Sequence, residues 1–136
     1  CMLGAEKQKA WLSDQSFAKK FGFTAVDRTD NGYELLALSF DGSIPRFAAW
    51  AKQMTVDAKG LTVYYDLQCP YIPQRVEKLR ERCDSNGIPA EFILVDSLEK
   101  AKALPCVFNN WAVFYDGKFV TVNQIDAAML EKLIKR

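Results

Sequence analysis

The 136-residue sequence contains no histidine. Ser-His and Cys-His nucleophile pairs are therefore excluded within the chain, and so are metal sites that use an imidazole ligand. The four cysteines, at positions 1, 69, 83 and 106, include no pair with the C-x-x-C spacing. This spacing indicates neither a zinc ribbon nor a disulfide framework, and we expect reduced thiols in a cytoplasmic protein.

Charge of one sign and long apolar runs are also lacking. Lys plus Arg (18) nearly balance Asp plus Glu (17), which leaves a net charge of +1. This balance makes no electrostatic case for binding to nucleic acid or to a membrane surface. No apolar run approaches the ~18 residues of a membrane span, and no signal peptide is visible. The chain starts at Cys1 rather than Met, which we interpret as a cut through a longer protein.

The composition, with 49% hydrophobic and 26% charged residues, is typical of one globular domain or one small domain with an appendage. Residues 14–21 predict a helix, capped by Ser13 or Asp14 and ended by Gly22. Phe17 and Phe21 are four residues apart and share one face of this helix.

A β-hairpin is predicted next, with strands over 23–28 and 33–40 and a turn at 30–32. The turn carries Asn31-Gly32, a pair that adopts the positive φ values of a tight hairpin turn. A short helix over 45–54, with Pro45 in its first turn, then leads into the second part of the chain.

The second part alternates regularly between strands and helices. We predict strands over 61–65 and 90–96, a hairpin over 111–122 that turns at 116–117, and helices over 74–83, 97–104 and the C-terminus. Gly87 ends the first of these helices and Ser97 caps the second. The last helix has Asn123 as its cap, and its buried stripe comprises Ile125, Ala128, Met129 and Leu133.

The element order is therefore β-α-β-α-β-β-α over 61–136. Continuous apolar strands indicate an α/β fold whose sheet is covered by helices on both faces. Val76, Leu79 and Cys83 form the buried stripe of the first helix. Trp111, Phe114 and Tyr115 are interpreted as core side chains.

Cys69 follows the first of these strands, in the stretch VYYDLQCPYIPQRVEKL. A thiol within a residue or two of a helix start lies near unpaired N–H groups that favour the thiolate. Dithiol exchange also needs a second sulfur one helical turn later, where this sequence has Ile72. Cys69 is therefore either a lone nucleophile or a half-buried small apolar residue at a strand end. The loop that contains Cys106 is expected to approach it.

This element order, with Cys-Pro-Tyr at the end of the first strand, resembles the thioredoxin and glutaredoxin fold. The resemblance implies substrate contacts by Tyr71 and by Asn109, the latter at the place where such proteins carry a cis-proline. Because non-proline cis peptides cost several kcal/mol, we expect no cis bond there. Catalysis by Cys69 follows only if the protein is a monothiol, glutathione-dependent enzyme.

The segments SFAKKFGFTAVDR and YELLALSF resemble the end of a GNAT-family N-acetyltransferase. With GLTVYYDLQCPY and FYDGKFVT behind them, the whole chain resembles the C-terminal part of acetyltransferases that carry a YoaP-like domain. The resemblance implies that 1–45 end the acetyltransferase domain, 46–60 connect, and 61–136 form the thioredoxin-like domain. It also implies acetyl transfer from acetyl-CoA to an amine by the full-length protein.

Two departures from the GNAT pattern matter. The glycine-rich loop that cradles the acetyl-CoA pyrophosphate is absent from this sequence, and Ala18 stands where many such enzymes have a tyrosine that protonates the leaving thiolate. The segment alone is therefore expected to be inactive, with no cofactor site of its own. Its expected partner is the missing N-terminal half of the acetyltransferase domain.

Two other functions compete with this interpretation. One is the monothiol enzyme that uses Cys69. The other is a non-catalytic interaction domain, which could form a homodimer through unpaired strand edges at 2–5 and 35–40.

Overall fold

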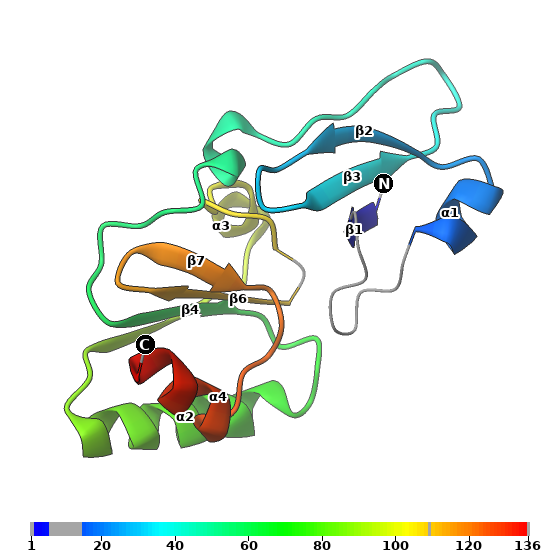
Figure 1. Ribbon diagram of the computed structural model, residues 1–136. Helices are drawn as coiled ribbons and strands as arrows, with labels where there is room; N and C mark the ends of the chain where they lie inside the picture. The colour runs from blue at the N-terminus through cyan, green and yellow to red at the C-terminus, as the bar shows by residue number, and fades with distance from the viewer. Residues whose placement is uncertain (1, 6–14, 109, 136) are drawn as a thin grey trace. The chain divides into compact units, whose positions relative to one another are not determined.

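The computed structural model describes residues 2–5, 15–108 and 110–135 (Figure 1). The chain divides into two compact units, Cys1–Lys52 and Gln53–Arg136. The division falls inside the expected connecting segment 46–60, so that its residues are shared between the units. Among the described residues the structure is mixed α/β, with two sheets and four α-helices.

Unit 1 contains a three-stranded antiparallel sheet. The strands are β1 (Met2–Ala5), β2 (Thr24–Arg28) and β3 (Tyr33–Ala37), in the order β1-β3-β2. The predicted hairpin is thus confirmed, and Gly32 in its turn has a φ of +89°. The prediction of an unpaired strand edge at 35–40 is wrong for residues 35–37, which belong to β3. β1 pairs with β3 and leaves β3 in the middle of the sheet.

The helix described in unit 1, α1, spans Ser16–Lys20 and ends before Gly22, as predicted. Its cap position is Gln15, which makes no side-chain capping bond. The predicted caps Ser13 and Asp14 lie outside the described residues. The rings of Phe17 and Phe21 are 5.0 Å apart between centroids, which confirms the shared face, and both are largely exposed.

The helix predicted over 45–54 is wrong in extent. Only a 3-10 turn, η1 (Ala49–Lys52), forms there. The cause is a set of contacts with Asp27 of β2: the N–H of Phe47 donates to its Oδ2 at 2.8 Å, and Lys52 Nζ donates to its Oδ1 at 2.6 Å. The hydrogen bond from Lys52 lowers the pKa of Asp27. Contacts across unit 1 therefore determine the backbone of this segment more than helix propensity does.

Unit 2 contains a four-stranded mixed sheet. Its strands are β4 (Leu61–Tyr65), β5 (Ala90–Leu94), β6 (Trp111–Tyr115) and β7 (Lys118–Thr121), in the order β5-β4-β6-β7. β4 and β5 are parallel, whereas β6 is antiparallel to both β4 and β7. The predicted hairpin turn at Asp116-Gly117 is confirmed, with positive φ at both residues.

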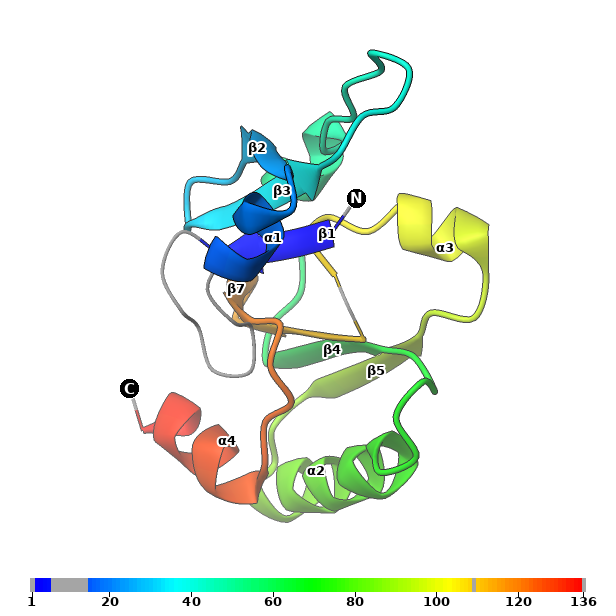
Figure 2. The same cartoon turned by 90° about the vertical axis from the view of Figure 1, so that its right-hand side faces the viewer.

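Three helices complete unit 2: α2 (Ile72–Asn86), α3 (Leu98–Lys102) and α4 (Ala127–Ile134). The predicted order β-α-β-α-β-β-α is confirmed. Gly87 ends α2 in the left-handed conformation, and the Ser97 side chain caps α3 by accepting a hydrogen bond from the Lys100 N–H. α2 and α4 cover one face of the sheet and α3 lies on the other, as expected for a sheet covered on both sides (Figure 2).

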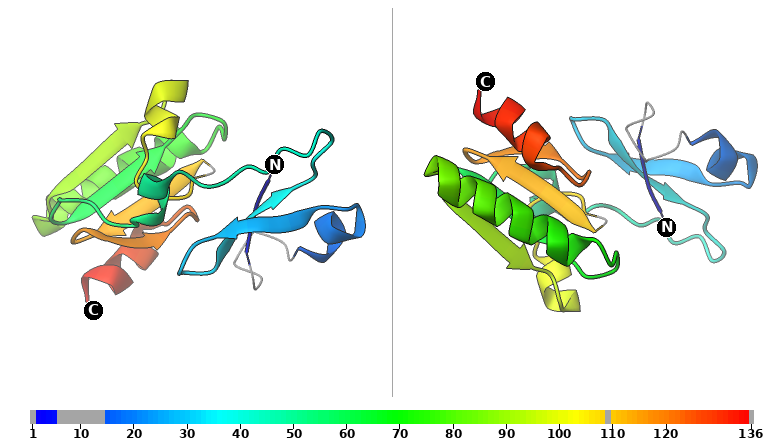
Figure 3. Two further views of the ribbon diagram at one scale, coloured as in Figure 1. Left: turned by 90° about the horizontal axis from the view of Figure 1, so that it is seen from above. Right: turned by 90° about the horizontal axis from the view of Figure 1, so that it is seen from below.

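The larger core of unit 2 lies beneath α2 and α4, which lie beside each other in the view from below (Figure 3). Buried Val76, Leu79 and Cys83 confirm the predicted stripe of α2. Burial of each large apolar side chain of this kind contributes roughly 1.5–3 kcal/mol. The smaller core lies on the opposite sheet face and contains Cys106, Ala112 and Phe114.

The expectation for the last helix needs correction. Asp126, not Asn123, caps α4, and its carboxylate accepts a hydrogen bond from the Met129 N–H at 2.8 Å. Within α4, Leu130 is buried in the larger core, whereas Ala128 and Met129 of the predicted stripe are exposed. Ile125 is buried and Leu133 packs against the core, as predicted. None of the helices in the described part of the chain is both long and apolar enough to cross a membrane.

Candidate functional site

Cys69 lies in the loop between β4 and α2, at the carboxyl end of the parallel strand pair. α2 begins at Ile72, three residues after Cys69, with Tyr71 at the cap position. The sequence argument for a thiolate needs the thiol within one or two residues of the helix start, so Cys69 is one residue too far from α2. The Cys69 carbonyl accepts a hydrogen bond from the Ile72 N–H at 3.1 Å, and its side chain is half-buried against the larger core.

A second sulfur is not available to Cys69 from the other described cysteines. Ile72 occupies the place of a resolving thiol and is fully buried. Cys83 faces the core from the far half of α2, and burial raises its pKa. The loop that contains Cys106 approaches the loop of Cys69, as expected: the Asp66 N–H donates to the Asn110 carbonyl at 3.2 Å. The Cys106 side chain itself packs on the opposite face of the sheet. Burial raises the pKa of Cys106 to about 12.

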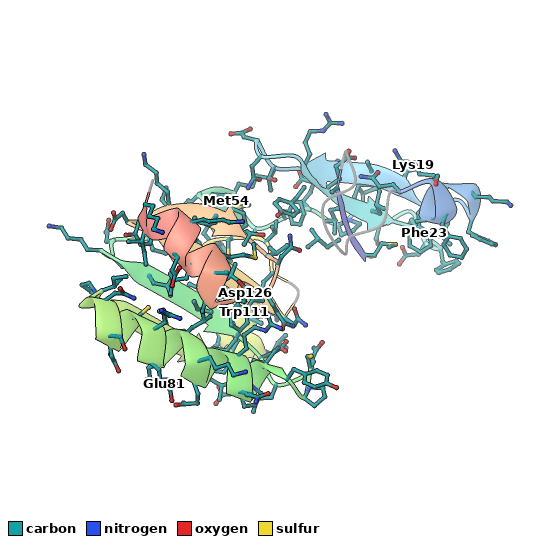
Figure 4. All side chains as sticks on the ribbon, turned by 60° about the horizontal axis from the view of Figure 1, so that its bottom comes forward. Lys19, Phe23, Met54, Glu81, Trp111 and Asp126 are labelled. Atoms are coloured by element: carbon teal, nitrogen blue, oxygen red, sulfur yellow. The ribbon has the colours of Figure 1, made fainter. Side chains whose placement is uncertain are left out.

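A groove of about 400 Å³ lies between the first two turns of α2 and the start of α4. One wall comes from α2 and its cap, and the other from the first residues of α4 and its cap. Figure 4 shows Asp126 where α4 begins. The lining residues are Tyr71, Gln74, Arg75, Lys78, Leu79, Asp126, Ala127 and Ala128.

The helix period explains why one wall of the groove is basic. Tyr71, Arg75 and Lys78 are spaced i, i+4, i+7 and therefore share one face of α2. Neither cation takes part in any ion pair found within the described ranges. Further along the same two helices, Arg82 and Glu131 form an ion pair at 3.0 Å.

Two buried polar atoms of unit 2 have no hydrogen-bond partner in the described part of the chain. They are Nε1 of Trp111, at the start of β6, and Oδ1 of Asn123, shortly before α4. Buried polar groups are nearly always paired, and an unpaired one costs about 1–3 kcal/mol. Among residues 2–5, 15–108 and 110–135, no cluster of acidic and cysteine side chains could hold a metal ion.

The three site residues suggested by the sequence have different positions. Tyr71 lines the groove and is 68% exposed. Cys69 does not line it, and Asn109 lies outside the described residues. The sequence argument missed Arg75, Lys78 and Asp126. The sequence pattern that could have pointed to Arg75 and Lys78 is the polar face of α2. The pattern for Asp126 is an acidic residue directly before the last helix.

Residues 89–132 match the family model described as YoaP-like. Over 134 residues, or 97% of the chain, the sequence is 32% identical to a protein of Bacillus subtilis (strain 168) named "Uncharacterized N-acetyltransferase YoaP". Both matches support a relationship of the chain to YoaP-like proteins. The resemblance to proteins of this kind, drawn from the sequence, is therefore confirmed.

The chain covers 53% of its Bacillus relative and thus spans about half of that protein's length. The family match runs from the start of β5 into α4 of unit 2, includes the groove residue Asp126, and begins after Cys69. No solved structure matches the chain at a significant level.

Proposed function

We propose that this chain is the C-terminal part of a GNAT-family N-acetyltransferase, which transfers an acetyl group from acetyl-CoA to an amine. In this proposal unit 2 is a non-redox module that binds or positions a ligand. The observation that carries the proposal is the 32% identity, over 97% of the chain, to a relative named as an N-acetyltransferase. The chain's near-complete alignment includes both units.

A thioredoxin-like arrangement of unit 2 is part of the same proposal. The support is topological: a central β4 has a parallel neighbour on one side and an antiparallel hairpin on the other, with helices on both faces. Among the described cysteines none lies beside Cys69, which supports a module without dithiol chemistry. Residues 1–45 would then be the end of the acetyltransferase domain, in a cytoplasmic protein.

The residues of this chain do not fit acetyl-CoA. No glycine-rich Q/R-x-x-G-x-G/A loop occurs in the sequence, and Ala18, at the place of the usual tyrosine acid, is a buried side chain without a proton to give. We therefore assign acetyl-CoA to the other half of the acetyltransferase domain in the full-length protein. The exposed Phe17, Phe21 and Phe40 of unit 1 supply apolar surface for packing against that half.

The test compares the full-length protein with the 136-residue chain. Thiol release from acetyl-CoA is measured with a panel of primary amines, and acetyl-CoA binding is measured by calorimetry. We expect turnover and binding by the full-length protein and neither by the chain alone. A full-length protein that neither binds nor consumes acetyl-CoA would contradict the proposal.

A monothiol enzyme is the second candidate, because Cys69 is the least buried of the described cysteines and precedes the exposed Tyr71 by two residues. We expect Cys69→Ser to leave folding and acetyl transfer unchanged, since a half-buried sulfur without a redox partner contributes only packing. The free energy of unfolding should change by less than about 1 kcal/mol. Denaturant unfolding and the acetyl-transfer assay check this.

The redox arm of the same experiment uses a glutathionylated peptide. Its reduction by the wild-type chain, in the presence of glutathione, should not exceed the uncatalysed rate. Catalysed reduction that disappears in Cys69→Ser would establish the monothiol function instead.

A homodimer, the third option, would use surface that the other half of the domain covers in the full-length protein. Sedimentation of the 136-residue chain and of the full-length protein tests this option. If unit 1 exposes apolar surface that the other half covers, the chain alone should self-associate while the full-length protein stays monomeric.

A further inference from the structure

We propose that the groove between α2 and α4 binds a small zwitterion, such as an amino acid or a short peptide, through its carboxylate and its ammonium group. The inference names the class of ligand held by the proposed positioning module, and to that extent it rests on the proposed function. Its basis is the arrangement of charge on the two walls of the groove.

The α2 wall provides the anion-binding side. Arg75 and Lys78 both line the groove, and neither is engaged in an ion pair within the described part of the chain. A guanidinium presents parallel N–H donors that match the two oxygens of a carboxylate, and an ammonium adds a flexible point charge. The amide of Gln74 supplies a neutral donor and acceptor on the same wall.

The α4 wall provides the cation-binding side. Asp126 Oδ1 is held by the Met129 N–H at 2.8 Å, which fixes the position of the carboxylate. No ion pair of the described residues joins Asp126 to Arg75 or Lys78, although all three line one groove. A ligand can therefore occupy the space between opposite charges without first breaking a bond between them.

The size and remaining contacts of the groove also favour a small polar ligand. Its volume of about 400 Å³ is at the small end of ligand-binding pockets. Ala127 and Ala128 have short side chains and therefore take little space on the α4 side of the groove. The exposed Tyr71 ring, at the cap of α2, can cover an aliphatic part of the ligand. Arg82 and Glu131 pair with each other further along the helices and so do not compete for it.

The experiment titrates the 136-residue chain with glycylglycine and follows the backbone amide resonances of Ala127 and Ala128 by NMR. N-acetylglycylglycine lacks the ammonium group, glycylglycinamide lacks the carboxylate, and inorganic phosphate reports a plain anion site. We expect saturable shifts with glycylglycine and about tenfold weaker binding of each probe that lacks one charge, because each loses a charge-assisted hydrogen bond.

Matched variants test the two walls separately. Asp126→Asn keeps the helix cap, since Asn caps as well as Asp, and should weaken glycylglycine about tenfold while leaving N-acetylglycylglycine unchanged. Arg75→Gln with Lys78→Gln should weaken both probes. The control, Lys59→Gln with Lys135→Gln, removes the same charge from exposed positions outside the groove and should bind as the wild type does.

Three outcomes would overturn the inference: no saturable shift at these amides, equal affinity for glycylglycine and phosphate, or equal loss of binding in the control variant. None of them depends on acetyl transfer. A chain that binds glycylglycine while the full-length protein fails to use acetyl-CoA would retain the groove and refute only the proposed function.

Discussion

Replacement of Gly60 by alanine is expected to lower the free energy of unfolding of unit 2 by about 3 kcal/mol or more, which is much of the stability of a small domain. Gly60 directly precedes β4 and has a φ of +76°, where an L side chain is strained. A Cβ at this position would lie 2.1 Å from the carbonyl oxygen of Pro89. That oxygen accepts the Leu61 N–H, a bond at the start of the parallel β4–β5 pair.

The clash cannot be relieved by a side-chain rotation, because both partners are backbone. Gly60 is also held on its other side: its N–H donates to Asp116 Oδ1 at 2.8 Å, and its carbonyl accepts the Asp116 N–H at 2.9 Å. A shift that restores the distance to Pro89 would disturb this connection to the β6–β7 turn. The site thus joins three strands of the sheet through one residue without a side chain.

Gly87→Ala is the matched control. Gly87 also has a positive φ, +64°, but a Cβ there would meet nothing within 4 Å. Its substitution should therefore cost only the backbone strain, roughly 1–2 kcal/mol. Denaturant unfolding followed by circular dichroism measures both variants. Equal losses for the two glycines would mean that conformation alone, not the contact with Pro89, makes Gly60 necessary.

The strands and helices of unit 2 could be predicted from local pattern alone. LTVYY is one apolar run that ends in a turn, and the predicted strand over 61–65 coincides with β4. Gly87 and the Asp116-Gly117 turn are likewise local signals that the structure uses as the sequence predicts. Each depends on a backbone preference of one or two residues, which needs no information about the rest of the chain.

The errors arose where distant residues decide the outcome. The stretch around Pro45 has helical pattern, but bonds to Asp27 hold it in another conformation. β1 is the third strand of its sheet because it pairs with β3, about thirty residues away. The hydrophobic periodicity of a segment does not predict which distant strand it pairs with. The cap of α4 was misjudged because Asn123 was preferred over Asp126, the residue that directly precedes the first turn.

The candidate site shows the same limit. Cys69 and Tyr71 were suggested by resemblance to redox proteins, whereas the groove is formed by α2 together with α4, some fifty residues apart in the sequence. Arg75 and Lys78 look like ordinary solvated charges until the second helix places Asp126 opposite them. Arg75, Lys78 and Asp126 line one groove only because α2 and α4 pack on the same face of the sheet.

The buried thiol of Cys106 predicts a loss of stability at high pH. Burial raises its pKa from 9.0 to about 12, and it shares the smaller core with Tyr64, whose pKa is also raised, chiefly by burial. Below about pH 9 the thiol is protonated in both the folded and the unfolded chain, so its titration does not affect stability. Above this pH the unfolded chain loses the proton first, and the free energy of unfolding falls by about 1.4 kcal/mol per pH unit until the folded-state pKa is reached.

Cys106→Ala removes this titration, so its stability relative to the wild type should improve by about 2 kcal/mol between pH 8 and pH 10.5. Val113→Ala is the control, because it truncates a fully buried side chain of β6, in the larger core, without removing a titratable group. Its deficit should stay constant over the same range. Urea unfolding at a series of pH values measures both differences. A constant gap between the wild type and Cys106→Ala would show that the thiol reaches solvent, and with it that the smaller core is open at Cys106.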